Sequence, residues 1–167
     1  MSTSVSPPRR KLLLTVHVAT AVSVLGTDLV LLVLGISSVR GADPQTVYPA
    51  ADLIATWVLA PLAILALGSG VLLGLLTRWG LFRYWWVTIK LALTAILTGI
   101  VLFVLVPGLG ARADAANAAR AFTADERLPL AVAPAAGVTL LILIVVLAVY
   151  KPPWRLRSAR NGRYERG

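Results

Sequence analysis

Residues 12–36 read LLLTVHVATAVSVLGTDLVLLVLGI, a run in which Asp28 is the only Asp, Glu, Lys or Arg. A helix needs ~20 mainly apolar residues to cross a bilayer, so this run predicts a transmembrane helix. It is longer than the ~7–15-residue apolar core of a secretory signal peptide, and we interpret it as a retained span. Three more runs of this kind follow at residues 52–77, 85–106 and 129–150.

The composition agrees with four spans. The 167 residues are 58% hydrophobic and 14% charged, with a mean hydropathy of +0.83. Soluble domains are ~45–50% apolar and ~25% charged, which excludes a soluble globule, a disordered tail and a nucleic-acid-binding domain. Because lipid cannot satisfy free backbone groups, the spans must be helical. We therefore predict an all-α, multi-pass protein of a bacterial inner membrane, with four helices within residues 12–150 between basic segments at 1–11 and 151–167.

The charges predict the orientation in the membrane. Most lysines and arginines lie in segments 1–11, 77–84 and 151–167, whereas most acidic residues lie in the connections on the other side. Basic residues stay on the cytoplasmic side, so both termini are expected in the cytoplasm. The net charge of +9 is then a sign of orientation and not of a nucleic-acid partner. The basic tail is either a topology signal alone or a contact for anionic lipid.

An internal repeat is a further expectation. The chain slid over itself matches residues of about 10–78 with those of 83–151, and the matches include polar and conformationally special residues: Arg10 with Arg83, Thr15 with Thr88, Gly26 with Gly99, Asp52 with Asp125, and Pro61 with Pro134. Both halves start on the same side, so the repeat predicts two parallel hairpins related by an axis along the membrane normal.

The same register leads to three local predictions. Asp52 and Asp125 are each expected to begin a helix, where an aspartate accepts free backbone N–H groups. Pro61 and Pro134 are expected to kink their helices at matched positions. The alanine-rich stretch 108–127 is expected to form a short helix on the outer surface.

Two ionisable residues are expected at equal depth near the cytoplasmic ends of their helices. The repeat places His17 opposite Lys90, while Trp86, Lys90 and Thr94 share one helix face. His17, Lys90, Trp86 and Thr94 are the candidate haem or ligand site. The alternatives are that Lys90 extends to the headgroups and that His17 is a hydrogen-bonded interior histidine.

Asp28 is the candidate proton or ion site. It lies eleven residues after His17, on the same face and ~16 Å along the helix axis. Because an acid exposed to lipid is costly, we expect this face to turn into the bundle. Asp28 then either takes part in a proton or ion step, or makes a hydrogen bond or an ion pair with Arg40 or Arg127.

Short motifs carry a family resemblance. Leu14–Val18 around His17 and the Trp86–Leu91 segment resemble an uncharacterised family of four-helix actinobacterial membrane proteins, a domain of unknown function. That family is distantly similar to the HemJ-type protoporphyrinogen oxidases and the CopD-like copper-resistance proteins. The resemblance implies the same helical scaffold and a haem-sized cleft at His17 and Lys90.

Three functions remain open on this reading. The first is a non-catalytic membrane subunit or assembly factor within a larger complex. The second is a haem- or tetrapyrrole-binding protein, in which His17 ligates iron; a single histidine excludes bis-histidine ligation within one protomer. The third is a small proton-coupled transporter that acts as a homodimer, because four helices are few for a pore. No catalytic residues are proposed, and absent cysteine excludes thiol chemistry.

Overall fold

A computed structural model describes residues 7–76 and 85–150, and helices make up nearly all of this part of the chain. The first helix, α1, runs over Pro7–Val39 and the last, α6, over Ala124–Tyr150. Between them α2 (Pro44–Ile54), η1 (Ala55–Leu59) and α3 (Ala60–Leu76) follow one another without a break, as do α4 (Trp85–Ile100), η2 (Val101–Leu105) and α5 (Val106–Asn117).

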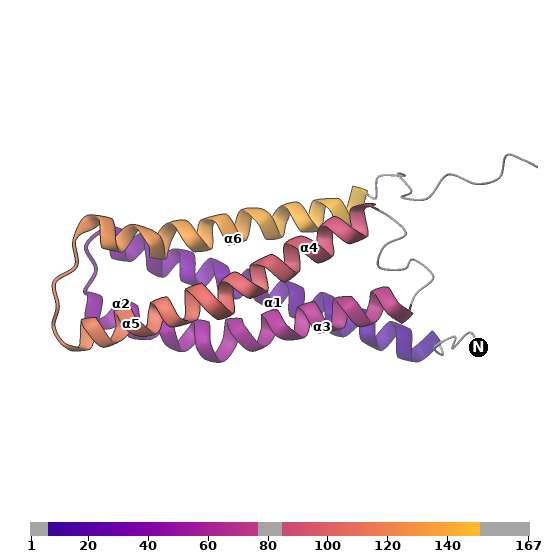
Figure 1. The fold of residues 1–167 in the computed structure, drawn as a ribbon, viewed down its shortest axis with the longest axis horizontal. Helices are drawn as coiled ribbons and strands as arrows, with labels where there is room; N and C mark the ends of the chain where they lie inside the picture. The colour runs from indigo at the N-terminus through magenta and orange to yellow at the C-terminus, as the bar shows by residue number, and fades with distance from the viewer. Residues whose placement is uncertain (1–6, 77–84, 151–167) are drawn as a thin grey trace, which may run out of the picture.

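The described residues thus form four long helices, each apolar enough to cross a membrane. Figure 1 shows them as an elongated bundle, with the start of α1 and the end of α6 at the same end. In the described residues, the prediction of an all-helical chain with four helices long and apolar enough to span a membrane is confirmed. The predicted segments at 77–84 and 151–167 lie outside the described residues.

The buried core lies toward the end remote from the two chain ends, where α2 packs on α5 and α1 packs on α6 (Figure 1). Alanines allow α2 and α5 to approach closely, since small side chains let helix backbones meet. Ala51, Ala55 and Ala116 are fully buried there. Tyr48 is also fully buried and stacks on Phe122 with ring centroids 4.6 Å apart.

At Gly35, α1 and α6 are in close contact. A side chain added at Gly35 would overlap the backbone of Leu130 and Ala131. Because Pro134 has no N–H, the Leu130 carbonyl lacks its donor four residues later. The bare Cα of Gly35 lets this carbonyl approach α1, in the manner of the Cα–H···O contacts found between helices.

Two segments of π-helix, η1 and η2, interrupt the second and third spans. In each, the backbone N–H after the segment bonds five residues back: Ala60 to the Ala55 carbonyl and Val106 to the Val101 carbonyl. A proline follows two residues after each segment, at Pro61 and Pro107. A proline ring crowds the carbonyl four residues before it, and widening the helix relieves that crowding.

This arrangement corrects the expectation of matched kinks. Pro61 does follow a distorted segment, but Pro134 is buried within a continuous α-helix. The second distortion precedes Pro107, in the third span. The two π-helical segments thus do not lie at matched positions of the expected repeat.

Two predicted boundaries are also corrected. The second span begins at Pro44, with Asp43 as its N-cap, so Asp52 lies inside α2, where it accepts a hydrogen bond from Thr56. Asp125 does lie in the first turn of α6. The stretch 108–127 does not form a separate surface helix, because the third span continues through it to Asn117.

Candidate functional site

One face of α1 forms a buried stripe that carries both candidate sites. Thr20 is 8% exposed, Asp28 is 6% exposed, and Leu31 and Ser38 are fully buried. His17 is half-buried at the N-terminal end of the stripe. The prediction that this face of the first helix turns into the bundle is confirmed.

His17 is held against α3 by hydrogen bonds from its ring. Its Nδ1 lies 3.1 Å from the Ala66 carbonyl and 3.0 Å from the Ser69 hydroxyl. That hydroxyl donates to the same carbonyl at 3.1 Å. Since a carbonyl only accepts, Nδ1 donates to Ala66 in the tautomer that carries the proton on Nδ1. In the neutral ring, Nε2 then keeps its lone pair.

The imidazole fits here because α3 carries a glycine beside it. A Cβ added at Gly70 would lie 3.0 Å from His17 Cε1, closer than ordinary van der Waals contact. Gly70 therefore serves a close contact between α3 and α1. The role of Ser69 was not predicted from the sequence.

The structure brings Lys90 to His17 but does not add the other two predicted ligand-site residues. The Lys90 ammonium lies close enough to the imidazole for an electrostatic interaction. Thr94 donates its hydroxyl to the Lys90 carbonyl at 2.8 Å, within its own helix. Trp86 is the second residue of α4, and its side chain lies outside the described residues.

Asp28 faces α6 and not α3. Its carboxylate rests on Gly137, where an added Cβ would overlap Oδ2. Within residues 7–76 and 85–150, no donor forms a hydrogen bond to this carboxylate and no basic side chain pairs with it. Gly137 was not singled out from the sequence; its only local signal is its place in a run of small residues.

The expected partners of Asp28 are engaged elsewhere or exposed. Arg127 donates through Nη1 to the carbonyls of Ser38 at 2.9 Å and Ala42 at 3.0 Å, which closes the end of α1. Arg40 is exposed. The alternative in which Asp28 pairs with either arginine is therefore wrong.

His17 and Asp28 form two separate sites along the stripe. Val24 is buried between them, and the Thr20 hydroxyl donates back to the carbonyls of Val16 and His17. At 1.5 Å per residue the two lie ~16 Å apart along the axis, so they do not share a ligand of ordinary size.

A polar hollow lies at the end of the bundle that is remote from the two described chain ends. It encloses about 250 Å³ beside Asp43, Arg120 and Arg127. Asp43 accepts from Gln45 and Thr46, and Arg120 pairs with Glu126. Because these charged groups already serve the fold, we assign no ligand to this hollow.

No protein-family model, curated protein or solved structure matches the chain. In the described part of the chain, no three side chains of His, Cys, Asp or Glu gather as a metal site. The functional argument consequently depends on the geometry of the buried stripe.

Proposed function

We propose that this chain is a small proton-coupled membrane transporter in which Asp28 takes up and releases the proton. The observation that carries the proposal is the burial of Asp28 in a helix long and apolar enough to span a membrane: the residue is 6% exposed, and no donor in the described residues forms a hydrogen bond to its carboxylate. Ionisable groups at such places mark ion and proton pathways by default.

The environment of Asp28 argues against a purely structural acid. A polar group buried without a partner costs about 1–3 kcal/mol, and more when it is charged. Taking up a proton removes the charge and most of that cost. Gly137 accommodates the carboxyl by steric room alone and offers no side-chain compensation. A carboxyl group that is costly to bury when ionised, and that a proton can neutralise, suits proton binding better than a packing role.

The proposal includes an orientation and an assembly. The basic residues of the N-terminal segment place the end with both described chain ends in the cytoplasm, so Asp28 belongs to the outer half of the membrane. His17 and Lys90 then lie in the inner half. Two parallel hairpins from an internal repeat, assembled as a homodimer in the cell membrane, provide the alternating arrangement that such transport uses.

An infrared titration of the purified protein tests the proton site without knowledge of the substrate. We expect a carbonyl band of a protonated carboxyl that changes with pH and disappears in Asp28→Asn. The matched control is Asp52→Asn, which removes a half-buried acid that has a hydroxyl partner. In vesicles, proton flux driven by a potassium gradient with valinomycin is expected to fall to the level of empty vesicles in Asp28→Asn.

Loss of the same band in Asp52→Asn, or its persistence in a folded Asp28→Asn variant, contradicts the proton site. A vesicle flux unchanged in Asp28→Asn contradicts its use in transport. An intact band without any flux favours the subunit or assembly-factor function instead. One observation supports that function. In the most apolar 18-residue stretch of the third span, only 6% is buried within the chain, against 33% in the corresponding stretch of the second span.

Haem binding at His17 is the second candidate, favoured by the ring geometry. Histidine ligands of metals commonly donate the other ring N–H to a backbone carbonyl, as Nδ1 does here to Ala66. A single imidazole suits a group such as haem, whose macrocycle brings the other iron ligands, and Lys90 would pair with a propionate. Bound haem would supply redox or ligand-binding chemistry, while α1 and α3 orient the ring.

An absorption spectrum tests this candidate. If haem binds, protein purified in mild detergent shows a Soret band that is lost in His17→Ala and kept in Asp28→Asn. Circular dichroism serves as the check on folding. A haem-supplemented sample with no band, or a band that survives in His17→Ala, rejects ligation by this histidine.

A further inference from the structure

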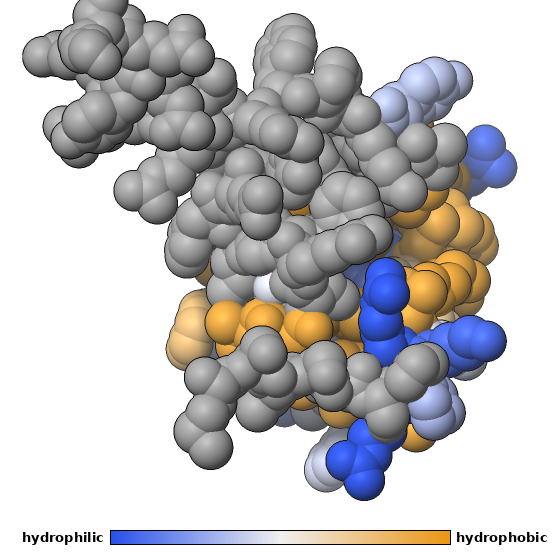
Figure 2. Space-filling view, turned by 90° about the vertical axis from the view of Figure 1, so that its right-hand side faces the viewer, coloured by the Kyte–Doolittle hydropathy of each residue, from blue (hydrophilic) through white to orange (hydrophobic). Residues whose placement is uncertain are grey.

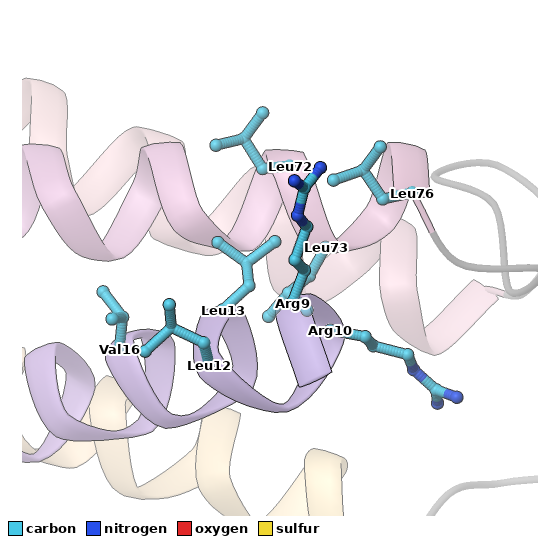
Figure 3. A pocket seen from close by; sticks show the side chains of 8 residues that line it. All are labelled: Arg9, Arg10, Leu12, Leu13, Val16, Leu72, Leu73 and Leu76. Carbon is cyan, nitrogen blue, oxygen red and sulfur yellow. The ribbon is translucent and has the colours of Figure 1, made fainter. Parts of the chain in front are cut away.

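A groove opens at the end of the bundle that carries the chain ends, between the first turns of α1 and the last turns of α3. It encloses about 420 Å³, within the ~300–1,000 Å³ typical of small-ligand sites. Figure 3 shows leucine side chains from both helices along its walls and two arginines at its mouth. In Figure 2, hydrophilic side chains stand beside apolar helix surfaces at this end.

The groove has apolar walls and basic side chains at its mouth. Leu12 and Val16 of α1 and Leu72 and Leu76 of α3 line the groove, so its walls are apolar. Arg9 extends across the groove toward α3, while Arg10 points away from it at the mouth (Figure 3). Across the ranges 7–76 and 85–150, neither arginine forms an ion pair with a carboxylate.

We propose that this groove binds one molecule of an anionic phospholipid. Arginine is suited to bidentate contacts with phosphate, so the headgroup phosphate belongs on Arg9 with Arg10 beside it. One acyl chain then lies between Leu12, Val16, Leu72 and Leu76. The position fits a lipid, because the first turn of a membrane helix lies at headgroup level and the next turns lie at the level of the acyl chains.

This site is independent of the proton site. α3 also holds His17 through Ala66 and Ser69, one to two turns deeper than Leu73. A bound lipid would bridge α1 and α3 at an end where little of the chain is buried, and would hold the two helices at one spacing.

Native mass spectrometry of the full-length protein tests the proposal. Delipidated protein in detergent is mixed with phosphatidylglycerol or phosphatidylcholine, and retained lipid is counted. We expect preferential retention of one phosphatidylglycerol. The preference falls to parity in the double variant Arg9→Gln, Arg10→Gln. The matched control is Arg40→Gln, an exposed arginine just beyond the other end of α1, which leaves the preference unchanged.

A second variant separates the groove from the surrounding positive charge. Leu72→Trp fills the groove and keeps both arginines, so it is expected to lower the retention of both lipids. An unchanged preference in the double arginine variant overturns the proposal, as does an equal loss in Arg40→Gln. Full retention in Leu72→Trp would mean that lipid is bound by surface charge alone, or that the chain itself covers the groove. Displacement of the lipid by inorganic phosphate would mean that the site binds anions in general. Either result overturns the proposal. Circular dichroism verifies the folding of each variant, and the arginine pair decides the matter if Leu72→Trp does not fold.

Discussion

Gly35→Leu is expected to lower the free energy of unfolding by about 3 kcal/mol or more, at or above the ~1–3 kcal/mol usual for overpacked cores. The cost is large because the obstacle is the backbone of Leu130 and Ala131, which cannot turn aside as a flexible side chain can. The α1–α6 contact must then separate. For a chain of this size, that loss corresponds to about 6–12 °C in the unfolding temperature.

Thermal unfolding in detergent, followed by circular dichroism, measures the effect. Gly26→Ala is the matched control, since nothing lies within 4 Å of a Cβ added at Gly26 in the same helix. Alanine in place of glycine inside a helix stabilises by roughly 0.5–1 kcal/mol, so the control is expected to move the unfolding temperature upward. Equal unfolding temperatures for the two variants argue against a close approach of α6 to Gly35.

Arg127→Gln has the second largest expected effect, a loss of about 2–3 kcal/mol. Hydrogen bonds from charged groups contribute ~1.5–3 kcal/mol each, and Arg127 makes two through Nη1 to the carbonyls of Ser38 and Ala42. We take a value below the sum because the guanidinium is only partly buried. Its removal leaves the Ala42 carbonyl without this donor, while the carbonyl of the fully buried Ser38 keeps only the backbone N–H of Gly41 at 3.0 Å.

Chemical unfolding in detergent measures this loss, and Arg112→Gln is its control. Arg112 is also half-buried, but its bond goes to the Gly108 carbonyl of its own helix. A contact within one helix adds little, so the control is expected to stay within about 0.5 kcal/mol of the unsubstituted chain. If both variants unfold alike, the contact of Arg127 with the end of α1 does not stabilise the fold.

The sequence predicted well what depends on composition and on the helical period. Long apolar runs revealed all four spans, and the spacing of His17, Thr20 and Asp28 identified the buried face of α1. These signals are local, because each can be read within one helix. The close contact at Gly70 was also predictable, since paired glycines at a spacing of four commonly mark helix contacts.

Helix boundaries and contacts between helices were harder to predict. The polar residues between Arg112 and Asn117 look like the end of a span, yet α5 continues because Asp114 and Asn117 lie on its exposed side while Ala113 and Ala116 are buried. Asp43-Pro44 is an ordinary N-cap followed by proline, a signal that was overlooked because the hydropathy rises only later. The sequence could not show that Asp28 contacts Gly137 or that His17 contacts Ser69, because no local pattern encodes which helix faces which.

The contact of the first helix with the last bears on the order of synthesis. Gly137, Leu130 and Arg127 all belong to α6, which leaves the ribosome after the other spans, whereas Asp28, Gly35 and Ser38 belong to α1, which leaves first. Until α6 has been made, Asp28 of the newly inserted first helix lacks its contact with Gly137 within the membrane, where an ionised acid is costly. An incomplete chain therefore lacks its most extensive helix contact, and the last segment to be made completes the surroundings of the first.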